Sequence, residues 1–152
     1  FRSLNSERML DSLKRRMARE CALKTLFMVD IGDNDYGGAL NYVLEEAKNL
    51  SHKEKSFCRR LVNGVMEKRE ELDRMLTGYL VNWQFDRLAA TVRNILRLAL
   101  FEMLFLDEIP AVVSINEAIE MTKTYQDDES SRFVNGILDK MKTDMVAGKE
   151  KK

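Results

Sequence analysis

The stretch that decides the fold comprises residues 88–104 and reads LAATVRNILRLALFEML. Its apolar side chains recur every three or four residues, which is the spacing that aligns side chains along one side of an α-helix. The apolar stripe is wide and consists of Leu88, Val92, Ile95, Leu96, Ala99, Leu100, Met103 and Leu104. A helix with so wide an apolar surface has to be covered by other elements on several sides. We therefore predict a central helix in this stretch, and Pro110 marks its end.

Helical periodicity also covers the part of the chain that precedes this stretch. Apolar residues recur from residue 10 to residue 29, which predicts a helix near the N-terminus. Leu10, Leu13, Met17 and Cys21 belong to its apolar stripe, and we expect Met17 and Cys21 to point into the core. Glycines and a short acidic run then predict a loop over residues 32–38, and a shorter stripe over residues 40–50 indicates a second helix.

Two sequence patterns predict where further helices begin. Ser51 followed by Glu54, and Ser114 followed by Glu117, have the spacing of a capping box, in which the two side chains satisfy backbone N–H groups at a helix start. The acidic residues 126–130 are expected to form a loop that leads to a last helix. In total we predict six or seven helices in one all-α domain.

The composition agrees with an all-helical domain. Of the 152 residues, 45% are apolar and 33% are charged, and the chain has seven Gly and a single Pro. It is too apolar for a disordered protein and too poor in turn residues for a many-stranded sandwich or barrel. The longest apolar stretch, residues 98–106, is much shorter than the roughly 20 residues of a membrane span. No signal peptide is visible, so we expect a cytoplasmic protein without a membrane segment.

Charge is balanced over the whole chain but unevenly distributed along it. The chain has 25 Lys plus Arg and 25 Asp plus Glu, which excludes a globally basic nucleic-acid-binding protein. Residues 1–29 nevertheless carry a net charge of +4, and residues 102–129 carry −7. We therefore expect one part of the molecule to meet an anionic partner and another part to meet a cationic partner.

Residues that could carry catalysis or bind a metal are scarce. The cysteines Cys21 and Cys58 lack CxxC spacing, and His52 is the only histidine, whereas a zinc site needs three or four such ligands. Neither a GxGxxG nor a GxxxxGK[ST] phosphate-binding loop is present. We therefore predict no metal, no cofactor and no enzyme. Both thiols are expected to be small core side chains and His52 an exposed loop residue, although a spatial Cys–His pair would allow a nucleophile.

The strongest indication of binding is the basic run at residues 14–19. On a helix, Arg19 lies one turn from both Arg15 and Arg16, so these guanidinium groups and Lys14 are expected to share an exposed face. An anionic partner would relieve the repulsion between them. Guanidinium groups bind phosphate oxygens and stack on bases, which suits RNA. A solvated helix face without a partner is the alternative interpretation.

Several other side chains allow two interpretations each. Arg97, within an apolar run, could contact a ligand, but a structural charge paired with a nearby acid is the expected role. Trp83 and Phe85 could form a base-stacking platform, but we favour anchors that hold their loop against the core. Phe133 follows a polar loop, where core packing and surface contact are both open.

Five blocks of the sequence occur in a recognisable order and spacing. They are RMARECAL at residues 16–23 with Leu26 and Phe27 after it, ILRLALFE at 95–102, Ile109 with Pro110, INEAIE at 115–120, and FVNGILD at 133–139. Together they resemble the NusB family of bacterial transcription antitermination factors, over about residues 13–141. Two departures stand out: Met17 occupies a position where some members carry another Arg, and residues 1–12 match no part of the family.

The resemblance implies a NusB-like fold of two packed helical bundles and a function without catalysis. It also implies that the chain binds single-stranded boxA RNA together with NusE, a small-subunit ribosomal protein. With RNA polymerase and other Nus factors, such a complex resists premature termination, notably on ribosomal RNA operons. The implied RNA-binding residues are Lys14, Arg15, Arg16, Arg19 and Phe133. The implied partner-binding residues are Asp127, Asp128, Glu129 and Phe27, of which Phe27 could equally belong to the core.

Two alternatives stay open beside this interpretation. NusB-like domains also target some ribosomal RNA cytosine methyltransferases to RNA, and the chain could be such a domain. A homodimer that masks the RNA-binding face is also possible, as in some family members. For the domain limits, we expect one RNA-binding domain over residues 13–146, between an extension of uncertain order at 1–12 and a frayed tail at 147–152.

Overall fold

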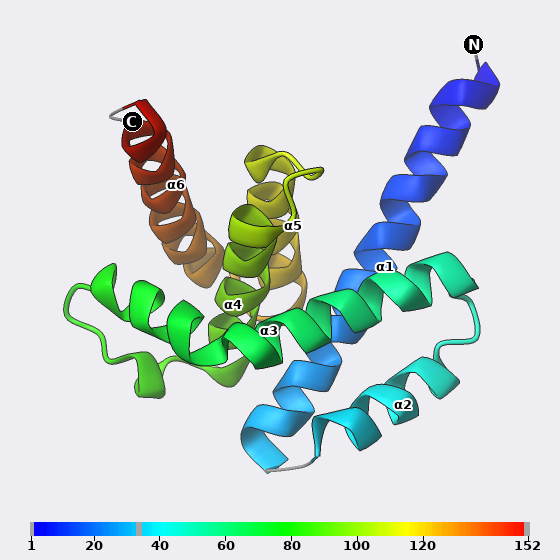
Figure 1. Ribbon diagram of the computed structural model, residues 1–152, viewed down its shortest axis with the longest axis horizontal. Coiled ribbons are helices and arrows are strands. Elements are labelled where there is room, and N and C mark those ends of the chain that lie inside the picture. The colour runs from blue at the N-terminus through cyan, green and yellow to red at the C-terminus, as the bar shows by residue number, and fades with distance from the viewer. Residues whose placement is uncertain (1, 33–34, 151–152) are drawn as a thin grey trace. The chain divides into compact units, whose positions relative to one another are not determined.

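The computed structural model describes residues 2–32 and 35–150, and the side chains of residues 5–32 and 35–148. Six α-helices follow one another along the chain (Figure 1): α1 (Arg2–Gly32), α2 (Tyr36–Glu46), α3 (His52–Gly78), α4 (Ala90–Phe105), α5 (Ala111–Tyr125) and α6 (Asp128–Glu150). A short 3-10 helix, η1 (Phe85–Arg87), precedes α4. The described ranges contain no strand, so the predicted all-α class is confirmed.

The helices divide between two compact units. The first unit extends to Gly64 and holds α1, α2 and the first part of α3, while the second unit begins at Val65 and holds the rest of α3 with α4, α5 and α6. Helix α3 is continuous through Gly64 and so belongs to both units. The predicted limits of the RNA-binding domain and of its two terminal segments stay predictions.

The core of the first unit lies where α1 packs against α2. Ala18 and Ala22 of α1 are completely buried. In contrast, Met17 is 36% exposed, so the prediction that it points into the core is wrong, and Leu10 and Leu13 of the same stripe are 51% and 48% exposed. Periodicity shows which side chains share a side of a helix, but it does not show how far a neighbouring helix reaches along that side.

Helix α4 lies at the centre of the second unit, as predicted. It packs against both α5 and α6, and α5 also packs against α6. Ile95, Leu96 and Leu98 are completely buried, which requires neighbours on more than one side. Elsewhere in the second unit, Tyr79, which directly follows α3, donates a hydrogen bond from its hydroxyl to Asp144 of α6 at 2.5 Å. This bond raises the pKa of Tyr79 to about 12.

The buried charge in α4 has the structural role expected for it. Arg97 is 4% exposed, and its Nε and Nη2 atoms lie 2.7 and 2.8 Å from the two carboxylate oxygens of Asp73 in α3. A third nitrogen, Nη1, donates to Asn94 at 2.9 Å, and the guanidinium also lies 5.2 Å from the ring centre of Phe85. Phe85 is 8% exposed, which confirms that it anchors its loop against the core. A buried guanidinium is tolerated because hydrogen bonds and an opposite charge replace its hydration.

The helix starts follow the sequence only in part. Helix α3 begins at His52, directly after Ser51, as predicted, but the hydroxyl of Ser51 donates to the side chain of Glu54, a side-chain pair rather than the side-chain-to-backbone bonds of a capping box. Ser114, however, lies inside α5, which begins at Ala111 with Pro110 as its N-cap residue. Its hydroxyl instead donates to the buried Glu102 of α4 at 2.9 Å, so the capping box predicted there is wrong.

Two predicted loops are shorter than expected because their polar residues begin helices. The side chain of Asp35 accepts a hydrogen bond from the N–H of Gly38 at 3.2 Å, and α2 already includes Gly37 and Gly38 of the predicted loop. Residues 33–34 of that loop lie outside the described residues. Similarly, Asp127 accepts from the N–H of Ser130 at 2.6 Å, and α6 begins at Asp128. None of the described helices is long and apolar enough to cross a membrane.

Candidate nucleic-acid interface

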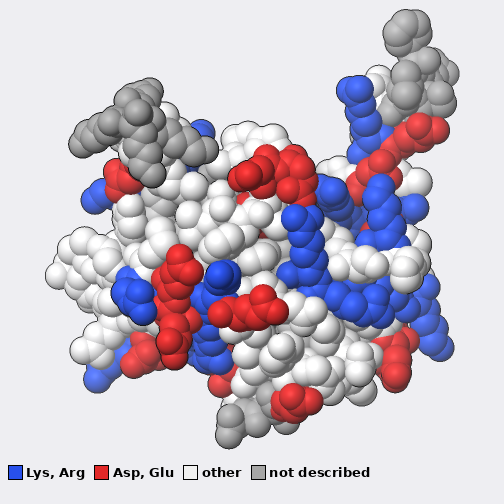
Figure 2. All heavy atoms as spheres, in the orientation of Figure 1, with Lys and Arg blue, Asp and Glu red and all other residues white. Residues whose placement is uncertain are grey.

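The predicted basic residues of α1 lie in the first unit but differ in exposure. The side chain of Lys14 is 38% exposed, and Arg15 and Arg16 are half-buried. Arg19 is only 2% exposed, so the expectation that all four cations share an exposed face is wrong for this residue. Three cations of the run therefore remain accessible to an anionic partner, and a continuous band of Lys and Arg side chains lies over α1 and the first part of α3 (Figure 2).

An aromatic ring of α3 explains how two arginines are held against the first unit. The guanidinium carbons of Arg15 and Arg19 lie 4.9 and 5.4 Å from the ring centre of Phe57. Such cation–π contacts contribute about 0.5–2 kcal/mol each, more where water is excluded. Phe57 was not among the residues predicted to contact a partner, so its contact with the basic run was missed. An aromatic residue between Lys55 and Arg59 was the available signal for it.

A buried carboxylate joins α1 to the start of α3. Glu54 is 6% exposed, accepts a hydrogen bond from Ser51 and lies 4.0 Å from the Nζ atom of Lys14. The hydrogen bond from Ser51, assisted by the charge of Lys14, lowers the pKa of Glu54. Glu54 therefore stays ionised and holds Lys14 near the N-terminus of α3.

The second unit brings Glu129 and Phe133 together with an exposed tryptophan. They line a pocket of about 390 Å³ with Trp83, Arg87 and further residues, namely Leu88, Ala89, Val92 and Ser130. The rings of Trp83 and Phe133 lie 6.2 Å apart at an interplanar angle of 62°, an edge-to-face arrangement. Phe133 is half-buried and Trp83 is 59% exposed, so the expectation that Trp83 anchors its loop in the core is wrong.

The acidic candidates form the start of α6. Asp127, Asp128 and Glu129 are all exposed. The hydrogen bond from the N–H of Ser130 lowers the pKa of Asp127, which favours its negative charge at the positive end of the helix dipole. Phe27, the remaining partner-binding candidate, is half-buried on α1 in the first unit, and the acidic residues belong to the second.

The remaining candidates are the residues that could bind a metal or react as nucleophiles. Among the residues that the structure describes, no three His, Cys, Asp or Glu side chains are placed to hold a metal ion. Cys21 and Cys58 are free thiols, and His52 is exposed at the first position of α3. Burial raises the pKa of Cys58 to about 12, so it carries no thiolate at neutral pH.

Comparisons with known proteins agree with this architecture. A model of the NusB family matches residues 16–143. The transcription antitermination protein NusB of Bacillus licheniformis is 46% identical over 133 residues, which are 88% of this chain and 99% of that protein. A solved structure of T. maritima NusB is 39% identical, with a TM-score of 0.78 over 83% of this chain and 88% of that one.

A second solved structure comes from a complex of antitermination factors NusB and NusE with double-stranded RNA. Its matching chain is 29% identical, with a TM-score of 0.76 over 83% of this chain and 93% of that chain. The fold, the spacing of the blocks and the sequence identity therefore agree over most of the chain. The protein belongs to the NusB family.

Proposed function

We propose that this protein is a transcription antitermination factor that binds boxA RNA jointly with NusE. With RNA polymerase and other Nus factors it would then suppress premature termination in the cytoplasm, notably on ribosomal RNA operons. The observation that carries the proposal is the match to curated antitermination proteins over nearly their whole length. A relative solved with NusE and RNA supports the choice of partners. The function needs no catalysis, since it depends on binding alone.

In this proposal the accessible cations of α1 hold the RNA backbone. Lys14, Arg15 and Arg16 contact phosphates, and the buried Arg19 positions the run through Phe57. Phe133, edge-on to Trp83, is the aromatic candidate for a base contact in the second unit. Three phosphate contacts to single-stranded RNA contribute a salt slope of about −2, because each contributes about −0.7.

The methyltransferase alternative is not favoured. The match spans 99% of a relative whose name is that of an antitermination protein. The homodimer stays an alternative for the protein without RNA, and sedimentation at several concentrations would detect it.

Fluorescence anisotropy with a boxA-type single-stranded RNA tests the RNA site. We expect tighter binding with NusE, and a loss of binding in the Arg15→Ala/Arg16→Ala variant, which keeps the buried Arg19. The matched control is Lys24→Ala/Lys140→Ala, which removes two exposed cations elsewhere. Equal losses in the two variants would show that the basic run has no special role, and failure of the wild type to bind would refute the proposed function.

A charge reversal tests the partner site. Asp128→Lys/Glu129→Lys keeps the Asp127 cap of α6 and should weaken NusE binding, because a basic ribosomal protein would meet like charge. Glu45→Lys/Glu46→Lys, on exposed positions of α2, is the control. Unchanged affinity of the α6 variant for NusE would refute this placement of the partner.

A further inference from the structure

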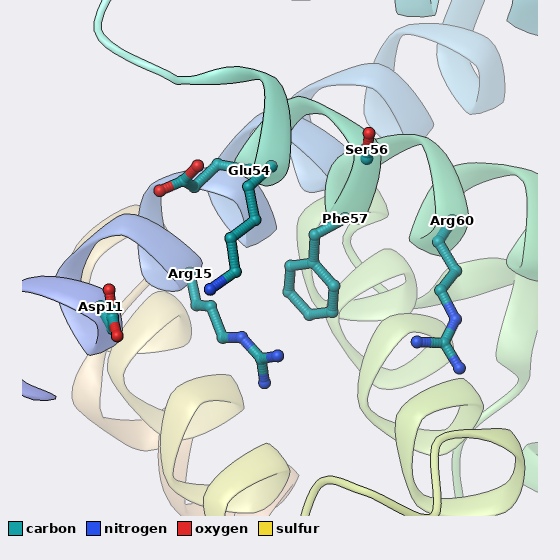
Figure 3. Close-up of a pocket in the computed structure, with 7 residues that line it drawn as sticks. Asp11, Arg15, Glu54, Ser56, Phe57 and Arg60 are labelled. Carbon is teal, nitrogen blue, oxygen red and sulfur yellow. The ribbon is translucent and has the colours of Figure 1, made fainter.

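A pocket between α1 and the first turns of α3 combines Arg15 with residues that have no role in the function proposed so far. It has a volume of about 250 Å³ and lies entirely in the first unit. Its lining residues are Asp11 and Arg15 of α1 and Lys53, Glu54, Ser56, Phe57 and Arg60 of α3 (Figure 3). We propose that this pocket binds the phosphodiester backbone of the RNA, with Lys53 and Arg60 as phosphate-contacting residues on α3. The proposal rests on the proposed RNA-binding function and extends the RNA path from α1 onto α3.

The spacing on α3 places the two cations on either side of one aromatic ring. Phe57 follows Lys53 by four residues and precedes Arg60 by three, so all three side chains share one side of the helix. Lys53 and Arg60 are two turns apart, about 11 Å along the axis. Both are exposed, whereas Phe57 is half-buried between them. The result is a basic ridge with an apolar centre.

Phe57 also fixes the orientation of the cation that α1 contributes. The guanidinium of Arg15 lies 4.9 Å from the ring centre, and Arg15 and Arg60 extend past either side of the ring toward the same side of the pocket (Figure 3). A guanidinium stacked on a ring uses its flat face, which leaves the N–H groups in its plane available to phosphate oxygens. Phe57 is therefore a positioning residue, and Arg15 links the basic run of α1 to the ridge of α3.

The charges that face the pocket favour an anion. Three cations line it against two carboxylates, and one of these, Glu54, is buried and already engaged by Ser51 and Lys14. Asp11 is the exposed anion of the lining, and it lies at the α1 edge. Lys53 and Arg60 stand on long, exposed side chains, so a single free phosphate gains little from them. A polymer that places several phosphates along the ridge gains from every contact.

The test compares two double substitutions on the same helix. Lys53→Gln/Arg60→Gln removes the two pocket cations of α3. The control, Lys55→Gln/Arg59→Gln, removes two cations of the same helix that do not line the pocket and whose charges lower the pKa of the thiols Cys21 and Cys58. Affinity for a 20-nucleotide boxA-type single-stranded RNA would be measured with NusE by anisotropy at several salt concentrations. We expect the pocket variant to reduce the salt slope by about 1.4 and the affinity at 0.1 M salt by roughly 25-fold. The control variant should leave the slope nearly unchanged.

A second pair of variants separates positioning from general destabilisation. Phe57→Leu should weaken RNA binding through Arg15, so it should add little to the loss already present in Arg15→Gln. Circular dichroism would verify that both variants keep the helical content of the wild type. Fully additive losses would refute a positioning role of Phe57.

The outcomes distinguish this inference from the proposed function. Failure of the wild type with NusE to bind the RNA refutes both. A second outcome would refute only the inference. In that case the wild type binds the RNA, Arg15→Ala/Arg16→Ala loses binding, and the affinity of Lys53→Gln/Arg60→Gln equals that of its control; the proposed function then stands. The last measurement is an NMR titration with inorganic phosphate. If phosphate shifts the Phe57 ring resonances while RNA binding is insensitive to Lys53→Gln/Arg60→Gln, the pocket binds free anions and not the RNA.

Discussion

Replacement of Asp73 by Asn tests the buried ion pair that joins α3 to the central helix of the second unit. The substitution keeps the shape of the side chain but removes its charge. In the wild type, each of the two carboxylate oxygens of Asp73 accepts a short hydrogen bond from Arg97. The substitution replaces one of these oxygens with an amide NH₂ group, which faces the guanidinium of Arg97. Asn can therefore accept only one of those bonds, and Arg97, at 4% exposure, cannot regain hydration.

The size of the effect follows from the burial of the two partners. Removal of one partner from a fully buried pair costs about 3–5 kcal/mol, because the other charge is left uncompensated. The side chain of Asp73 is 26% exposed, so water moderates the loss, and we expect about 2–3 kcal/mol. For a chain of this length, that corresponds to a fall of about 5–10 °C in the melting temperature.

Urea unfolding, followed by circular dichroism, measures the effect. Glu71→Gln, an exposed carboxylate of the same helix, is the control and should change stability by less than about 0.5 kcal/mol. In an Arg97→Met background, Asp73→Asn should lower the free energy of unfolding by less than in the wild type, because no buried guanidinium is left without its partner. Equal costs in both backgrounds, or a cost no larger than that of Glu71→Gln, would refute the reasoning.

Three further predictions concern single side chains. Ser114→Ala should destabilise the protein by about 1–2 kcal/mol in urea unfolding, because the buried carboxylate of Glu102 loses its 2.9 Å hydroxyl donor, and a cost near zero would contradict this. Asp127 has a lowered pKa, so its contribution to stability is complete above the pKa of the unfolded carboxyl and is lost as the pH falls through its native pKa. The melting temperatures of the wild type and Asp127→Ala should therefore differ most at neutral pH and converge in acid, and a difference independent of pH would exclude this role. Cys58, buried and with its pKa raised to about 12, should react with a thiol reagent at neutral pH only after unfolding, and rapid labelling of the native protein would be inconsistent with its burial.

The parts of the fold that were predictable are those set by local periodicity. The wide stripe of α4 identified a central helix because its side chains are covered on several sides. In α1 the same periodicity placed Met17 in the core, although it is exposed, since the sequence does not show where a packing partner ends. Ser114 misled for a related reason. A capping-box spacing can occur inside a helix when Pro110, four residues earlier, already begins it.

The candidate site was predictable where it depends on spacing along one helix. The basic run of α1 follows from positions three and four residues apart, but the burial of Arg19 depends on Phe57, which lies 38 residues further along the chain. The pairing of Trp83 with Phe133 likewise joins residues 50 positions apart. Each aromatic residue was visible in the sequence, whereas the contact that gives it a role is set by tertiary packing.

The order of the helices along the chain also bears on how the protein is made. Helices that pack together mostly follow one another in sequence, as α1 with α2, α4 with α5 and α5 with α6 do. The contacts between them are therefore close in sequence, and such local contacts favour rapid folding. The contacts of Phe57 with α1 lie within the unit that ends at Gly64, so they can form on the ribosome before α4 is translated. The bond from Tyr79 to Asp144 spans 65 residues and must wait for the last helix. The nascent chain can therefore acquire its basic pocket early and complete its second unit only after α6 has been made.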